Sequence, residues 1–250
     1  MLFWLLGAVG TLAAGTWAEE AAKLSETNRS VTLLEEAPAF TAESTQGKIN
    51  FPKDYKGKWV ILFFYPADFL PVPATEVLTL AAMNPEFRAL NCEVLGLSGD
   101  GLSAHLGWLR SLQEKVVYKN MRGVNVNIPL IDDIRQEILK KFGGGANGLF
   151  VVDPKGRIRA ALSYPPAVGR NFMEIKRMLV ALQTADGYTI NTPADWQPGE
   201  DVLLPLPATL GTARERSDAA GKDYYNLDWY LSLKKLGKDS IPPAPIKKER

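Results

Sequence analysis

The sequence contains very little cysteine and histidine, and this scarcity excludes several kinds of site. Its 250 residues include one cysteine, Cys92, and one histidine, His105. A single cysteine cannot form a disulfide within the chain, and the two residues together cannot supply the ligands of a Cys/His zinc site. A metal site would have to use carboxylates, for which the adjacent Asp132 and Asp133 are the nearest candidates. Adjacent acids after a strand are more typical of a turn and a helix N-cap, so we predict neither a metal site nor a cofactor.

The sequence also lacks an excess of charge of one sign. It has 29 basic and 28 acidic residues, a net charge of +1 and an isoelectric point of about 7.7. No basic surface of the kind that binds phosphate backbones is indicated, and we predict no nucleic-acid partner. With 46% apolar residues, the chain can bury one α/β core and still have residues left for terminal extensions.

Charged side chains are absent from the first 18 residues. A helix of this length is about 27 Å long, close to the thickness of the hydrocarbon part of a bilayer. Gly7, Gly10 and Ala14 are small, as close packing between membrane helices requires. We predict a transmembrane anchor over residues 1–20, in contact with the lipid bilayer through residues 1–18, and a linker over residues 21–30. A secretory signal peptide cleaved after Ala18 is the alternative, although its basic N-terminal region is missing.

Hydrophobic patterns in the middle of the chain predict alternating strands and helices. Residues 58–65 form a continuous apolar run rich in β-branched and aromatic side chains, as expected for a central strand that is buried on both faces. Further strands are predicted over residues 93–98, 148–152 and 157–163, and helices over residues 75–90, 102–113, 133–142 and 171–183. This order predicts an α/β domain over residues 31–185 that contains a parallel pair of strands.

The composition changes over the last 65 residues. Prolines interrupt residues 193–207, and an aromatic cluster follows at Tyr224, Tyr225, Trp229 and Tyr230. We predict that residues 186–250 form an extended arm whose aromatic side chains contact partner subunits. The last ten residues, 241–250, are proline-rich and basic, which favours an extended segment lying on another surface.

Several separated segments carry a resemblance to one family. Residues 55–60, 62–76, 91–98, 105–108, 164–172 and 192–201 resemble, in order and spacing, segments of peroxiredoxins of the alkyl hydroperoxide reductase/thiol-specific antioxidant type, especially the one-cysteine subfamily. The resemblance implies a thioredoxin-like fold over about residues 31–207. It also implies a reactive cysteine at the start of a helix, activated by a threonine hydroxyl and an arginine. In this sequence the cysteine position is Pro73, the threonine position is Leu70 and the arginine position is Asn147.

These three residues cannot supply the chemistry of the groups they replace. Proline is not a nucleophile, leucine cannot form a hydrogen bond, and asparagine carries no positive charge. We therefore predict a pseudo-enzyme derived from a thiol peroxidase, not an enzyme. Cys92 is interpreted as a packed structural thiol within a strand, with a residual thiol-dependent redox enzyme as an alternative. His105 is interpreted as a packed structural histidine and not as a general base.

The resulting functional prediction is a catalytically inactive, membrane-anchored accessory subunit of a larger membrane complex. The predicted location is the mitochondrial inner membrane, with the secretory pathway as the alternative. A peroxide or small-molecule sensor on a membrane anchor is an alternative function. A homodimer formed through the thioredoxin-like domain is a further predicted partner arrangement.

Overall fold

The computed structural model describes residues 31–143, 145–218 and 223–237. Their contacts divide the chain into two compact units. The first comprises the described residues up to Ala81 together with Glu93–Gly169, and the second comprises Ala82–Cys92 together with the described residues from Arg170 onward. The predicted anchor, with Gly7, Gly10 and Ala14, and the predicted linker over residues 21–30 lie outside the described residues.

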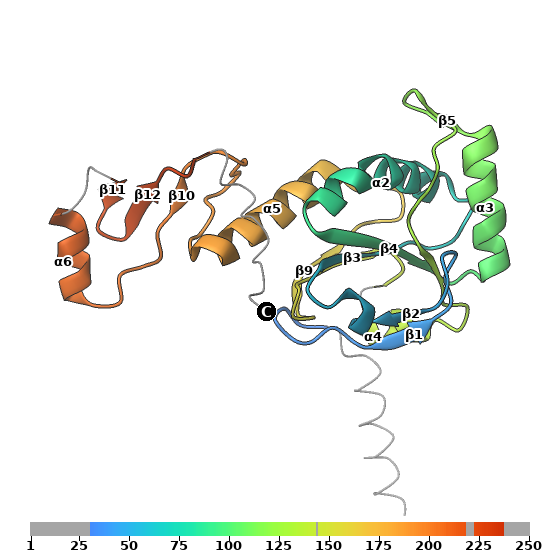
Figure 1. The fold of residues 1–250 in the computed structure, drawn as a ribbon, viewed down its shortest axis with the longest axis horizontal. Helices are drawn as coiled ribbons and strands as arrows, with labels where there is room; N and C mark the ends of the chain where they lie inside the picture. Colours follow the sequence, from blue (N-terminus) through green and yellow to red (C-terminus); the bar gives the residue numbers. More distant parts are fainter. Residues whose placement is uncertain (1–30, 144, 219–222, 238–250) are drawn as a thin grey trace, which may run out of the picture. The chain divides into compact units, whose positions relative to one another are not determined.

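The elements follow one another along the chain as Figure 1 shows. Their bounds are β1 (Phe40–Ala42), β2 (Ile49–Phe51), η1 (Lys53–Tyr55), β3 (Trp59–Phe64), α2 (Pro71–Ala89), β4 (Cys92–Ser98), α3 (Leu102–Lys115), β5 (Val117–Tyr118), β6 (Met121–Arg122), β7 (Leu130–Asp132), α4 (Glu137–Phe142), β8 (Gly148–Val152), β9 (Ile158–Ser163), α5 (Phe172–Tyr188), β10 (Val202–Leu203), α6 (Leu210–Asp218), β11 (Tyr224–Asp228) and β12 (Leu231–Lys234).

A five-stranded sheet with the order β7-β4-β3-β8-β9 forms the centre of the first unit. β4 pairs with β7 in parallel, whereas β8 pairs with β3 and with β9 in antiparallel fashion. The predicted central strand is confirmed, because all six residues of β3 are buried. The predicted hairpin over residues 148–163 is also confirmed, with Asp153 Oδ1 accepting hydrogen bonds from the backbone N–H groups of Lys155 and Arg157 in its turn.

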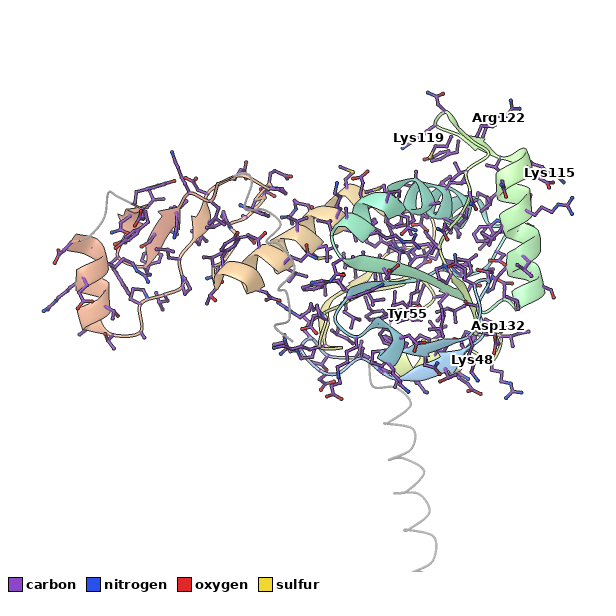
Figure 2. The ribbon with its side chains drawn as sticks, in the orientation of Figure 1. Lys48, Tyr55, Lys115, Lys119, Arg122 and Asp132 are labelled. Atoms are coloured by element: carbon purple, nitrogen blue, oxygen red, sulfur yellow. The ribbon has the colours of Figure 1, made fainter. Side chains whose placement is uncertain are left out.

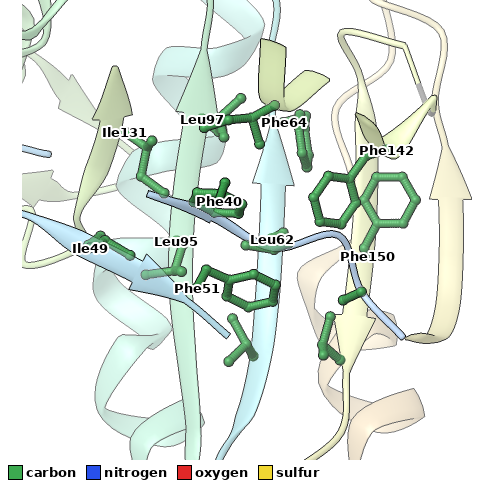
Figure 3. Close-up of a cluster of buried hydrophobic side chains, with 14 of the residues drawn as sticks. Phe40, Ile49, Phe51, Leu62, Phe64, Leu95, Leu97, Ile131, Phe142 and Phe150 are labelled. Atoms are coloured by element: carbon green, nitrogen blue, oxygen red, sulfur yellow. The ribbon is translucent and has the colours of Figure 1, made fainter. Parts of the chain in front are cut away.

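Aromatic side chains fill much of the core on one face of this sheet (Figure 3). The ring of Phe142, from α4, lies 5.4 Å from that of Phe64 and 5.1 Å from that of Phe150, measured between centroids. Phe40 and Phe51, from β1 and β2, stack at 5.0 Å against each other in the same cluster. The alternation of β3 explains this arrangement, since Leu62 and Phe64 point to the same face.

A small hairpin, β5–β6, follows α3. Lys119 and Asn120 at its turn have φ angles of 45° and 63°, a left-handed pair that suits a two-residue hairpin. Lys115, Lys119 and Arg122 are labelled around this end of the unit in Figure 2.

The second unit contains a buried cluster that consists of Val180, Ala181, Ile190, Trp196 and Val202. Beyond it, β10, β12 and β11 form an antiparallel sheet in that order, and α6 precedes β11. The predicted extended arm therefore contains regular structure within the described part of residues 186–250.

The transmembrane part of the predicted fold class is corrected. Among the helices of residues 31–143, 145–218 and 223–237, none is long and apolar enough to cross a membrane. Within these described residues the predicted single-pass membrane architecture finds no support, and the mitochondrial inner-membrane and secretory locations that depended on it are not retained.

Candidate active site

The loop between β3 and α2 lies at the carboxyl ends of the central strands, where ligands bind in many α/β folds. The backbone N–H of Tyr65 donates to Leu97 O over 3.0 Å, which holds the start of this loop against β4. A cavity of about 30 Å³, enough for roughly one water molecule, lies at the ends of the two strands. Pro66, Ser98 and Ala146 are among its lining residues, so the segment before β8 reaches the same place.

A buried hydrogen-bond network holds the loop between β3 and α2 in place. The Asp68 carboxylate accepts the Tyr65 hydroxyl on Oδ1 over 2.9 Å, and its Oδ2 lies 2.8 Å from His105 Nδ1. The backbone N–H of Asp68 donates to Asp100 Oδ2 over 2.7 Å, and the Ser98 hydroxyl donates to the same oxygen over 2.9 Å. Residues from the loop, from the end of β4 and from α3 are thus joined in one network.

The partners of His105 determine its protonation. Nδ1 faces the Asp68 carboxylate, and Nε2 lies 3.1 Å from Ile131 O, so both ring nitrogens face hydrogen-bond acceptors. A neutral imidazole can donate from one nitrogen only, whereas the imidazolium donates from both. Burial by itself lowers the pKa of His105, but the hydrogen bond and charge of Asp68 outweigh burial and raise its pKa. The geometry therefore favours a buried imidazolium–carboxylate pair.

Aromatic rings surround the same network. Burial, followed by the charge of Asp68, raises the pKa of Tyr65, so this phenol stays protonated as a hydrogen-bond donor. The Tyr65 ring lies 5.5 Å from that of the buried Trp108, and Phe69 contacts Trp108 from the other end of the loop at 6.4 Å. Phe69 has a φ of 59°, a left-handed conformation that is unusual for a residue with a bulky side chain.

The three positions assigned by resemblance lie around this loop. Leu70 is the residue before α2 and is 39% exposed, whereas Pro73 is buried in the first turn of α2. Helix N–H groups in the first turn have no partner within the helix, so Pro71 and Pro73 fit here without loss of a helical hydrogen bond. Asn147 is partly buried immediately before β8. The start of α2 at Pro71 is four residues earlier than predicted.

The thiol of the chain is separate from this loop in sequence and in secondary structure. Cys92 is the first residue of β4, is in no disulfide and is only 1% exposed. It directly follows Asn91, which has a φ of 53° in the turn between α2 and β4.

Asp132 is the last residue of β7, and the N-cap of α4 is Gln136 and not Asp133, but both carboxylates accept backbone N–H groups at helix starts. Asp132 Oδ2 accepts the backbone N–H of Leu102, the first residue of α3, over 3.2 Å. Asp133 accepts the backbone N–H groups of Ile138 and Leu139 at the start of α4. Within the described residues, no group of three or more metal-ligating side chains is placed to hold an ion.

The aromatic candidates of the C-terminal region lie on β11 and in the turn after it. The Tyr224 hydroxyl donates to Arg216 O over 3.0 Å, and the Tyr225 hydroxyl donates to Asp201 Oδ2 over 2.9 Å. Trp229 and Tyr230 are both about half exposed.

Sequence reasoning missed Asp68 and Tyr65 as partners of His105. The two residues flank Pro66 and Ala67 in the loop, and 37 positions separate Asp68 from His105 along the chain. An acidic residue in the loop that follows a fully apolar strand was the available signal, since a carboxylate that becomes buried there is costly without a partner.

Comparison with known proteins places these features in a family. Residues 33–161 match the AhpC/TSA family, and residues 181–217 match the C-terminal domain of 1-Cys peroxiredoxin. A peroxiredoxin of Methanosarcina mazei is 45% identical over 210 residues, which are 80% of this chain and 96% of that protein. A peroxiredoxin of Aquifex aeolicus is 38% identical over 82% of this chain and 96% of that protein.

Solved structures agree with the sequence matches. The yeast mitochondrial 1-Cys peroxiredoxin is 32% identical and superposes with a TM-score of 0.73 over 82% of this chain and 100% of that chain. Peroxiredoxin 6 of Arenicola marina is 27% identical, with a TM-score of 0.69 over 82% of this chain and 98% of that chain.

These relatives correct two predictions about activity. The prediction of an inactive accessory subunit of a membrane complex, with lipid and membrane-subunit partners, finds no support among them, because they are named peroxiredoxins. The pseudo-enzyme prediction is overturned by the same names. It relied on three positions, whereas the likeness extends over about four fifths of the chain. The chain belongs to the peroxiredoxin family.

Proposed function

We propose that this protein is a thiol-dependent peroxidase that reduces hydroperoxides. The observation that carries the proposal is the 45% identity to a peroxiredoxin over 96% of that protein's length. The ordered loop after β3, with its buried Asp68–His105 pair, lies at the carboxyl ends of the strands, whereas Cys92 begins β4, so the loop is assigned no part in the Cys92 reaction.

Thiol chemistry in this chain depends on Cys92, because the sequence has no second cysteine. The Cys92 thiolate attacks one peroxide oxygen, the O–O bond breaks, and the departing oxygen takes a proton to become an alcohol or water. Sulfur is oxidised to the sulfenic acid while the peroxide is reduced. Two molecules of an external thiol then return Cys92 to the thiol, with release of water and formation of their disulfide.

The burial of Cys92 sets a structural requirement for this reaction. A side chain that is 1% exposed reacts only after the beginning of β4 separates from its surroundings. Strand ends next to turns open at lower cost than strand centres, and Asn91 makes such a turn. We expect turnover to be slow and to be limited by this opening.

Leu70, Pro73 and Asn147 remain our assignment of the positions that carry threonine, cysteine and arginine in relatives. The combined change Leu70→Thr, Pro73→Cys and Asn147→Arg should increase peroxide consumption at least 10-fold, because it places an activated thiol in the first turn of α2. Pro73→Cys alone should give less. Equal rates for the parent and the triple variant would contradict the assignment.

The test of the proposed function is consumption of hydrogen peroxide in the presence of excess dithiothreitol. The parent chain should exceed the buffer rate, and Cys92→Ser should return the rate to that of buffer. Thermal melting of both proteins checks that the substitution leaves the fold intact. A parent rate equal to that of buffer would refute the proposal.

We further propose that two copies pair through the thioredoxin-like unit. Phe69 and Leu70 are consecutive apolar side chains that are 61% and 39% exposed. The ring of Phe69 packs against that of Trp108. Light scattering should give the mass of a dimer for the parent and of a monomer for Phe69→Arg. Val117→Arg, at a similarly exposed apolar residue of β5, is the matched control and should stay dimeric. A monomeric parent would contradict this part of the proposal.

A further inference from the structure

A groove of about 450 Å³ lies in the second unit beside the turn between β11 and β12. One wall is α6, through Leu210, Ala213, Arg214, Ser217 and Asp218, and the other contains Trp229. Figure 1 shows α6 next to β11 and β12 at this end of the unit.

Apolar and aromatic side chains at the groove are exposed. Trp229 is 54% exposed, Tyr230 is 51% exposed and Leu210 is 81% exposed. The rings of Trp229 and Tyr230 meet edge to face, with centroids 5.6 Å apart and planes at 70°. Contiguous exposed aromatic surface of this kind is typical of binding sites.

Hydrogen bonds between α6 and β11 shape the groove in advance. The Tyr224 hydroxyl and the Asn226 side-chain amide both donate to Arg216 O, which ties the last turn of α6 to the strand. Asp228 Oδ1 accepts the backbone N–H of Trp229 over 2.7 Å and fixes the aromatic turn. A groove held in this way loses little conformational entropy when it binds a segment.

The C-terminal residues of the chain have the composition that fits such a groove. Residues 238–250 lie outside the described part of the chain and contain Pro242 and Pro245 three positions apart, with Lys247 and Lys248 following. Proline-rich segments of this spacing bind between aromatic side chains, and basic residues beside the prolines pair with acids at the groove. Asp218 lines the groove, and Asp228 directly precedes the lining residue Trp229, so one carboxylate lies in the groove and a second lies next to its other wall.

The length of the segment permits it to reach the groove of its own chain. β12 separates Tyr230 from the C-terminal segment and has four residues, a length of about 13 Å. The thirteen residues after Gly237 can extend about 40 Å. A short connection of this kind also gives the segment a high effective concentration at the groove.

We propose that the proline-rich C-terminus, residues 241–250, binds in the groove between α6 and the Trp229–Tyr230 turn of the same chain. The prolines contact the two aromatic rings, and the lysines face Asp218 and Asp228. This interaction is independent of peroxide chemistry.

Photo-crosslinking in the full-length chain tests the proposal. Ala244 is replaced by the photoreactive residue p-benzoylphenylalanine, and the crosslinked peptides are identified by mass spectrometry. The expected product is a link within one chain to residues 210–218 or 229–230. Pro242→Ala with Pro245→Ala should reduce its yield at least 10-fold, as should Trp229→Ala.

Two controls keep the outcome decisive. The double proline change alters none of the described residues, so it serves even if Trp229→Ala disturbs the hairpin. Leu106→Ala removes a similarly exposed side chain from α3 and should leave the yield unchanged. A link that joins two chains would identify a second copy as the occupant and overturn the proposal. So would a link to other residues, a yield unaffected by the prolines, or no link.

Discussion

β3 of the first unit and the β11–β12 hairpin of the second show two different ways of holding strands in place. All six residues of β3 are buried between two covered faces of the sheet. Among the five residues of β11 and the four of β12, only Ser232 is buried, and α6 beside them has no buried residue. β3 is stabilised by the hydrophobic core on both faces of its sheet. The hairpin is held mainly by hydrogen bonds, and its aromatic side chains Trp229 and Tyr230 are about half exposed.

The comparison is sharpened most by removing a ring from the core of the first unit. Phe142→Ala should lower the free energy of unfolding by about 4 kcal/mol, because three neighbouring aromatic rings lose their contacts with it. Leu227→Ala in β11 removes a side chain that is mostly exposed and should change the free energy of unfolding by no more than about 0.5 kcal/mol. Denaturant unfolding of both variants measures the difference, and equal effects would contradict the contrast between the regions.

Removing the charge of Asp68 should give the next largest effect. Asp68→Asn should cost about 3 kcal/mol, because it leaves the buried His105 without its ionic partner. Glu137→Gln, at an exposed side chain of α4 with only a 4.0 Å ion pair, is the matched control and should be nearly neutral. A loss below about 1 kcal/mol for Asp68→Asn would show that the pair contributes little to the loop.

The pH dependence of stability should reflect the Asp68–His105 ion pair. The pKa of His105 is raised above its unfolded value of 6.5, so its stabilising contribution is complete below that pH. The contribution is lost as the pH rises through the raised pKa of the folded state. Each unit by which the folded pKa exceeds the unfolded pKa corresponds to about 1.4 kcal/mol of stability. His105→Gln should flatten the plot of stability against pH in this range. Asp68, Asp100 and Tyr65, the other titratable groups around residue 105, are unchanged in the variant. A parent stability that does not decline above neutral pH would contradict the imidazolium assignment.

The smallest effect is expected in the second unit. Tyr225→Phe removes the hydrogen bond to Asp201 on an exposed surface and should lower the free energy of unfolding only slightly. Unfolding monitored by circular dichroism should show only this small decrease in stability. A loss as large as that of Asp68→Asn would mean that this sheet depends on its own contacts far more than its exposure indicates.

Much of the first unit could be predicted from the sequence because its signals are local. The apolar run over residues 58–65 and the turn sequence before Arg157 specify a buried strand and a hairpin through residues adjacent in the chain. The start of α2 was predicted too late because two prolines in the first turn interrupt the apolar pattern without breaking the helix.

The candidate site could be predicted only in part. The loop itself was identified through resemblance, but the Asp68–His105 pair joins residues brought together by the sheet, and no local pattern indicates such a pair. The C-terminal sheet was missed for a similar reason, since β10 and β12 are short and pair across about 30 residues of intervening chain. Short strands with few buried residues give weak periodic signals.

Trapping the oxidised thiol tests the central claim of peroxide reduction most directly. The reduced full-length chain is mixed with one equivalent of hydrogen peroxide without external thiol, then treated with dimedone, and its peptides are analysed by mass spectrometry. The account predicts loss of the peroxide and a dimedone adduct on Cys92, with neither event in Cys92→Ser. Unconsumed peroxide together with an unmodified Cys92 thiol would contradict it.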